Sequence, residues 1–99
     1  ALRVKAAREI QKERFAGKGI FCNAAMNNRL IEKYCPLCPD CKALLERIIE
    51  RMNLSARACS RIIKIARTIA DLDGQTFILP EHISEAAGYR FLDKQNIFD

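Results

Sequence analysis

The stretch Leu54-Ser-Ala-Arg-Ala-Cys-Ser-Arg-Ile-Ile-Lys-Ile-Ala-Arg-Thr-Ile-Ala-Asp-Leu-Asp-Gly74 carries the most regular hydrophobic pattern of the chain. Its apolar residues recur every three or four positions, which is typical of one face of an amphipathic helix. Ser55 is a suitable N-cap, and Gly74 suits the left-handed end of a helix. We therefore expect a helix over 56–72. Its predicted buried residues are Ala58, Ile62, Ile65, Ala66 and Ile69.

The segments before this helix also have helical patterns. Apolar residues at mostly three- and four-residue spacing predict a first helix over residues 1 to about 15, ended by the glycines at 17 and 19. A second, short helix is expected between 20 and 34, with Asn23 as its cap. A strongly amphipathic third helix is expected to begin after Asp40 as N-cap and to run to Met52.

After the central stretch, residues 75–79 form a short link of β-prone residues. Pro80 then suits the first position of a fifth helix, with Glu81 placed to favour its positive end. Residues 92–99 are expected to fray. The sequence therefore predicts an all-α bundle of four or five helices that forms a single domain over residues 1–99.

The composition limits the class of protein. Of the 99 residues, 49% are hydrophobic and 29% charged, enough apolar surface for one core. No apolar run approaches the length of a membrane span and no signal-peptide pattern is present, so we expect a cytoplasmic protein with no membrane partner. Five cysteines favour reduced thiols over a disulfide framework. The chain begins inside a helical pattern without a methionine, so we expect it to be part of a longer protein.

The usual motifs of a self-sufficient enzyme are missing. The sequence has no glycine-rich phosphate loop followed by Lys-Ser or Lys-Thr, no Gly-x-Ser-x-Gly, and a single histidine, His82. His82 lies near the start of the fifth predicted helix, where a surface or capping role is expected rather than a ligand role. Any catalytic contribution of this chain would therefore go to a site built mostly elsewhere.

The net charge of +5 is unevenly distributed. Residues 1–18 and 55–70 each carry +4, whereas residues 71–99 carry −4. On the central helix a narrow stripe holds Arg57, Arg61, Lys64 and Thr68. Arg57 lies in the first turn, where a cation opposes the helix dipole unless an anion shares the site. A guanidinium beside the amides of a helix start can bind phosphate, although these facts alone favour a solvated basic face.

At these residues a family resemblance becomes visible. The stretch 54–74 closely resembles the C-terminal part of magnesium-chelatase-like AAA+ ATPases of the ComM/YifB type. The following Ile78-x-Pro-Glu-His-Ile-x-Glu-Ala-x-x-Tyr-Arg90 and the opening Arg3-Val-x-x-Ala-Arg8-x-x-Gln11-x-x-Arg14-Phe are similar to the same family. The resemblance covers nearly the whole chain, and it implies the helical lid domain of a ring-forming ATPase.

The resemblance also implies roles for individual residues. Arg57 matches the sensor-2 arginine of such lids, which reaches the γ-phosphate of ATP in its own or in a neighbouring subunit, and Arg61 is the second candidate. The ATP and Mg²⁺ would be held by the longer parent, an ATPase, and not by this domain alone. The implied partners are its own N-terminal AAA+ core, neighbouring subunits of a homo-oligomeric ring, and DNA remodelled by a helicase or translocase. Candidate contacts with nucleic acid or a subunit are Arg3, Arg8, Arg14 and Lys64, although for the cations of the first helix we favour a solvated face or ion pairs with Glu9 and Glu13.

Two departures from the family pattern concern cysteines. Cys59 stands where the family usually has an aromatic residue. Cys35, Cys38 and Cys41 form a Cys-x2-Cys-x2-Cys pattern, but a zinc ion or cluster needs a fourth ligand, and Leu45 stands where an iron–sulfur run would have its next cysteine. Since Cys22, Cys59 or His82 would complete such a site only by chance of folding, we expect small buried thiols and no metal.

Two other functions fit the same residues. A free-standing basic helical module could bind nucleic acid through its first and fourth helices. A lid of a true magnesium chelatase subunit, acting in the metallation of a tetrapyrrole, is a third interpretation. We favour the ATPase lid, because the resemblance is to the ComM/YifB type.

Overall fold

The computed structural model describes residues 2–20 and 22–95, with side chains described for 4–20 and 22–88. The described residues form α1 (Leu2–Arg14), a short 3-10 turn η1 (Asn23–Ala25), α2 (Asn28–Tyr34), α3 (Pro39–Met52), α4 (Ala56–Leu72) and α5 (Pro80–Gln95). They contain no β-strand. The prediction of an all-α fold is confirmed.

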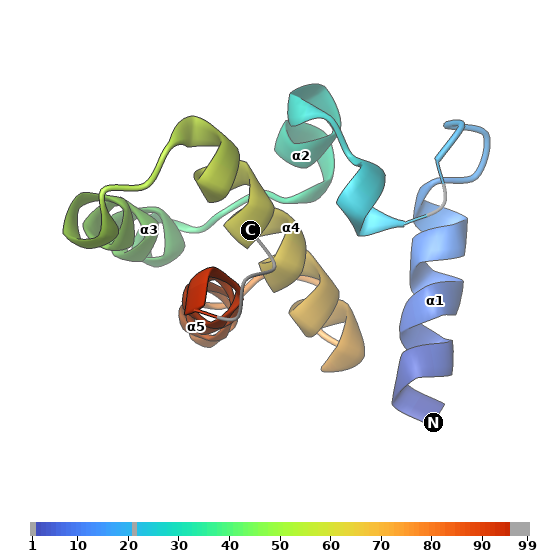
Figure 1. The fold of residues 1–99 in the computed structure, drawn as a ribbon. Helices are drawn as coiled ribbons and strands as arrows, with labels where there is room; N and C mark the ends of the chain where they lie inside the picture. Colours follow the sequence, from blue (N-terminus) through green and yellow to red (C-terminus); the bar gives the residue numbers. More distant parts are fainter. Residues whose placement is uncertain (1, 21, 96–99) are drawn as a thin grey trace.

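Helix α4 is the central element (Figure 1). It packs against α5, α1, η1 and α2, and α3 packs against α5. Both predicted ends of α4 are confirmed. The Ser55 hydroxyl accepts a hydrogen bond from the Ala58 amide at 3.2 Å, and Gly74 has a φ of 70° just beyond the helix. Local sequence chemistry therefore defines this helix.

The core lies where α4 faces its neighbours. Ile62, Ala66 and Ala70 of α4 are fully buried, as are Ile83 and Ala86 of α5. Small alanines on both helices allow their backbones to approach closely. The predicted buried face of α4 is confirmed at Ala58, Ile62 and Ala66, while Ile65 and Ile69 are half-buried.

The second predicted helix differs from the structure. It is broken into η1 and α2, and the N-cap of α2 is Asn27, whose side chain accepts a hydrogen bond from the Leu30 amide at 2.9 Å. Asn23, the predicted cap, is 1% exposed and its side chain bonds to α1 and α4 instead. Those tertiary hydrogen bonds outweigh the local capping preference, which is worth about 1 kcal/mol.

The third helix begins slightly earlier than predicted. Its N-cap is Cys38 rather than Asp40, and Pro39 is its first residue. Proline favours the first helical position and an extended conformation in the residue before it. Helix α5 begins at Pro80, as predicted, and continues to Gln95, so it includes the first part of the segment expected to fray. Residues 96–99 lie outside the described residues.

None of the helices that the structure describes is both long and apolar enough to cross a bilayer.

Candidate functional site

A groove of about 860 Å³ runs between the N-terminal half of α4 and the segment formed by η1 and the start of α2. We call it the basic groove, because Arg57, Arg61 and Lys64 line it and none of its described lining residues is acidic. Its other polar lining residues are Asn27, Asn28 and Ser60. Three of the four residues of the predicted stripe are thus brought together on one wall.

Arg57 is the second residue of α4 and its side chain is exposed. The guanidinium makes no hydrogen bond or ion pair with the described residues. The first turn of α4 contains no acidic side chain, and the backbone amides there give this end of the helix a partial positive charge. An anion seated beside Arg57 would therefore interact with both the side chain and the helix end.

The other residues of the stripe have different surroundings. Arg61 is exposed one turn beyond Arg57. The Lys64 ammonium donates a hydrogen bond to the Ala24 carbonyl at 3.3 Å, which fixes its stem between α4 and η1. The Thr68 hydroxyl donates to the Lys64 carbonyl at 3.2 Å and accepts from the Asn23 side-chain amide at 3.0 Å. Thr68 therefore belongs to the packing of η1 on α4 and not to the basic groove.

A buried polar network joins α1, η1 and α4. Two guanidinium nitrogens of Arg14 donate to the Asp71 carboxylate at 2.9 and 2.7 Å, and one of them also donates to the Asn23 side-chain oxygen at 2.9 Å. Asn23 donates to the same carboxylate at 2.9 Å, and its backbone amide donates to the Gln11 side chain at 3.1 Å. The hydrogen bonds to Asp71 raise the pKa of Arg14.

This network corrects the exposed contact role considered for Arg14. Its side chain is 13% exposed and its guanidinium is held by residues of the same chain. The ion pair is made with Asp71 of α4 and not with Glu9 or Glu13 as considered from the sequence. Arg14 therefore fastens α1 to α4. Arg8 is exposed on α1 and lines neither groove, and the side chain of Arg3 lies outside the described ones.

Arg67 is a second buried cation, which contributes to the charge of +4 on residues 55–70. Its side chain is 2% exposed and pairs with Asp71 at 3.1 Å. It also donates to the carbonyls of Thr76 and Gln75 at 2.9 and 2.8 Å. Burial lowers the pKa of Arg67, and the Asp71 charge opposes that effect. The signal available in the sequence was an opposite-charge pair at i, i+4 beside the buried alanines of α4.

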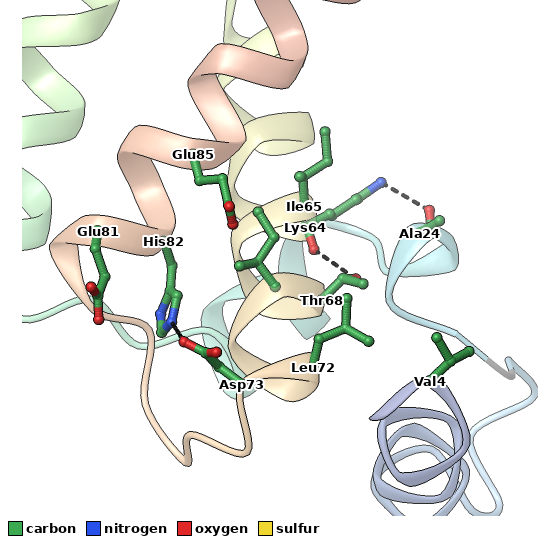
Figure 2. A pocket seen from close by; sticks show the side chains of 11 residues that line it. Val4, Ala24, Lys64, Ile65, Thr68, Leu72, Asp73, Glu81, His82 and Glu85 are labelled. Atoms are coloured by element: carbon green, nitrogen blue, oxygen red, sulfur yellow. Dashed lines mark hydrogen bonds and ion pairs between the residues drawn. The ribbon is translucent and has the colours of Figure 1, made fainter. Parts of the chain in front are cut away.

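A second groove, of about 750 Å³, lies between α1, α4 and α5. Figure 2 shows Val4 and Ala24 on one side of it and Glu81, His82 and Glu85 of α5 on the other. Lys64 lies between the two grooves and lines both. The acidic side chains Asp73, Glu81 and Glu85 distinguish this groove from the basic groove.

His82 caps α5 from within the protein. Its Nδ1 accepts a hydrogen bond from the Leu79 amide at 2.9 Å, so in the neutral ring the proton is on Nε2, which donates to Asp73 at 3.1 Å. The side chain is 2% exposed. Of the two roles expected from the sequence, surface or capping, the structure shows capping by a buried ring.

One carboxylate oxygen each of Asp73 and Glu81 and one ring nitrogen of His82 lie within 4.8 Å of one another, which is close enough to consider a metal ion. A metal on Nε2 would need the ring proton on Nδ1, where it would oppose the Leu79 N–H donor. These three residues therefore do not fit a metal as they are arranged.

The three central cysteines do not come together. Within the described part of the chain, the only grouping of three potential metal ligands is the one at His82, so Cys35 is separated from the Cys38–Cys41 pair. Cys35 is buried, and burial raises the pKa of its thiol to about 11. Cys22 is exposed and Cys59 half-buried, and neither joins the pair.

Comparison with known proteins gives consistent matches. The family described as magnesium chelatase, subunit ChlI C-terminal, matches residues 1–90. The chain is 46% identical to competence protein ComM of Haemophilus influenzae over 88 residues, which cover 89% of the chain and 16% of that protein. It is 42% identical to the uncharacterized protein YifB of Salmonella typhimurium over 72 residues, which cover 73% of the chain and 14% of that protein. It is 39% identical to the uncharacterized protein YifB of Escherichia coli over 92 residues, which cover 93% of the chain and 17% of that protein.

The chain thus spans only a small part of these relatives. No solved structure is significantly similar to it.

Proposed function

The chain belongs to the family of magnesium chelatase ChlI C-terminal domains and is similar to ComM and YifB, and from this we propose that it is the lid of a longer ATPase in which Arg57 contacts ATP phosphates. The chain alone carries no phosphate loop, so the ATP and Mg²⁺ would be held by the rest of the parent protein.

The basic groove is the observation that carries this proposal. Three cations line it, none of its described lining residues is acidic, and Arg57 has no described partner that competes for its guanidinium. A guanidinium offers two parallel N–H donors that match two phosphate oxygens. A solvated structural arginine would have no need of a position at a helix start, where its charge is unfavourable by about 0.3–1 kcal/mol.

Arg57 would act electrostatically. A donor that is already aimed at the γ-phosphate stabilises the charge that spreads over its oxygens as the phosphoryl group is transferred. Arg61 is the second candidate for the same contact, and Lys64 adds positive charge farther along the groove. The nucleotide would be bound by the N-terminal core of the same subunit or by a neighbouring subunit of a homo-oligomeric ring. ATP hydrolysis would drive remodelling of a substrate. We propose that this substrate is DNA and that the parent acts on it as a helicase or translocase.

The test is ATP turnover by the full-length parent. Arg57→Ala is expected to lower the turnover at least tenfold, since a single arginine on a transferring phosphoryl group can raise kcat by about 10³- to 10⁵-fold. Arg47→Ala is the matched control, because Arg47 is exposed on α3 and lines neither groove. Circular dichroism of the 99-residue chain should show unchanged helicity for both variants. Turnover equal to that of the Arg47→Ala control would remove Arg57 from the site.

Nucleic-acid binding by the chain itself is the alternative that this lid proposal has to exclude. Two of the cations in the basic segments, Arg14 and Arg67, are committed to Asp71, which weakens the basic surface. We expect the 99-residue chain to bind DNA weakly and with strong salt dependence. Tight, sequence-selective binding in an anisotropy titration would favour the free-standing module instead.

A further inference from the structure

We propose that Cys38 and Cys41 form a reversible dithiol–disulfide pair at the start of α3, which exchanges with low-molecular-weight disulfides. Neither the lid function nor the basic groove uses these residues. The proposal rests on the position of the two thiols, on the difference in their exposure, and on the hydrogen bonds that join them.

The two sulfur atoms are already in contact. Cys38 is the N-cap of α3 and Cys41 lies in the first turn, and their Sγ atoms are 3.2 Å apart. The Cys38 sulfur also accepts a hydrogen bond from the Cys41 amide at 3.4 Å. A disulfide bond of about 2.05 Å therefore needs a shift of only about 1 Å, within the first turn of the helix.

The two thiols differ in the way that disulfide exchange requires. Cys38 is exposed, whereas Cys41 is fully buried. Hydrogen bonds from the Cys41 thiol and amide lower the pKa of Cys38. Burial, and then the hydrogen bond to Cys38, raise the pKa of Cys41 to about 11. Cys38 is thus the accessible attacking thiolate, and Cys41 is the protected thiol that resolves the mixed disulfide.

The hydrogen bonds of the reduced pair form a chain. When both groups are protonated, the Cys38 thiol donates to the Cys41 sulfur, and the Cys41 thiol donates to the buried Ile78 carbonyl at 3.4 Å. When Cys38 ionises, the Cys41 proton turns toward the Cys38 thiolate. Oxidation removes this proton, so the Ile78 carbonyl loses its donor. Oxidation of the pair therefore changes the hydrogen bonding of the segment that leads into α5.

A metal site is the competing interpretation of neighbouring cysteines. The third thiol of the pattern, Cys35, lies too far from Cys38 and Cys41 to share a metal ion with them. Among the described residues, no acidic or imidazole group adds a third ligand to the Cys38–Cys41 pair. Two thiols in contact, one exposed and one buried, are the arrangement of a redox pair.

The exchange balances as two successive substitutions. The Cys38 thiolate attacks one sulfur of a small disulfide, forms a mixed disulfide and releases one thiolate, which takes up a proton from water. Cys41 then loses its proton, and its thiolate attacks the Cys38 sulfur and releases the second small thiolate, which takes up that proton. The two cysteines are oxidised by two electrons in total, and the small disulfide is reduced to two thiols.

The experiment uses the 99-residue chain in glutathione buffers of graded ratio, quenched with acid and analysed by mass spectrometry. We expect a chain that has lost two hydrogens, with the bond mapped between Cys38 and Cys41, fully reversible on addition of reduced glutathione. Cys38→Ser should abolish the bond, and Cys22→Ser, which changes another exposed thiol, should leave it intact. Oxidation that stops at glutathione adducts, or a bond that involves Cys35, would overturn the proposal.

A kinetic measurement on the unmodified chain does not depend on the folding of any variant. Iodoacetamide should alkylate Cys38 at least about tenfold faster than both Cys22 and Cys41 at neutral pH, because the reaction follows the thiolate fraction and exposure. Alkylation of Cys38 at the rate of Cys22 would contradict the lowered pKa. Zinc bound to the purified chain in equal amount, and lost on alkylation of the pair, would show a metal site instead.

Discussion

Replacing Asp71 by asparagine tests whether the buried network holds α1 on α4. The Asp71 carboxylate is 1% exposed and balances two guanidinium groups, Arg14 at 2.7 Å and Arg67 at 3.1 Å. The asparagine would keep the size of the side chain but remove its charge, and in either orientation its NH2 group would face a donor of Arg14. The substitution therefore leaves two cations buried without a counter-charge.

The expected cost follows from that geometry. Removing one partner of a buried ion pair costs about 3–5 kcal/mol, against a total stability of about 5–15 kcal/mol for a domain of this size. Since 1 kcal/mol shifts Tm by about 4–8 °C in a domain of 60–100 residues, Tm should fall by at least about 12 °C. Arg14→Met should cost less, about 1.5–3 kcal/mol, because Asp71 keeps Arg67 and Asn23 as partners.

The assay is urea unfolding of the 99-residue chain followed by circular dichroism. Glu50→Gln on the exposed face of α3 is the control, with an expected change within about 0.5 kcal/mol. The double variant Arg14→Met/Asp71→Asn should lose less than the sum of the single losses, by about 0.5–3 kcal/mol, because the two residues share one interaction. A loss below about 1 kcal/mol for Asp71→Asn, or strict additivity, would refute the buried network.

Two further predictions concern the backbone and the thiols. Gly74 has a φ of 70° with open space around an added Cβ. Gly74→Ala should therefore lower the free energy of unfolding, measured in urea, only by the cost of the left-handed conformation, about 1–2 kcal/mol, and Gly74→Asn should lower it less. Equal losses for the two variants would contradict this. Burial raises the pKa of Cys35 and Cys41 from 9.0 to about 11 in the folded chain. A pKa raised by folding contributes stability that is present below pH 9 and lost as the pH rises toward 11, so the reduced chain should weaken over that range. Cys35→Ala should flatten this dependence, and an unchanged slope would contradict it.

The helices of this chain could be predicted where local chemistry defines them. The period of α4, its cap at Ser55 and its end at Gly74 all involve residues within a few positions of one another. The same holds for Pro80 at the start of α5. Arg57 could also be selected, since its place in the first turn of α4 is readable from the pattern. Its groove could not, because η1 and the start of α2 form the opposite wall.

The errors concern polar residues whose partners are distant in the chain. Asn23 was predicted as a helix cap, but its side chain bonds to Thr68 and Asp71, which lie 45 and 48 positions farther along the chain. Arg14 was considered for an exposed contact or for an ion pair within its own helix, yet it pairs with Asp71, 57 positions away. A buried charge is tolerated only when an opposite charge meets it, and no local pattern tells which segments meet.

The sequence by itself determined the all-α fold, the ends of α4 and the start of α5, the resemblance to the magnesium chelatase C-terminal family, and the choice of Arg57. These follow from hydrophobic period, capping and residue identity, which act within a few residues. Only the tertiary structure decided which cations of α4 are buried and which line a groove. Of the four basic residues on α4, Arg67 is buried against Asp71, while Arg57, Arg61 and Lys64 line one groove. The reason is that burial and ion pairing depend on the packing of α1 and η1 against α4, and that packing joins residues far apart in the chain.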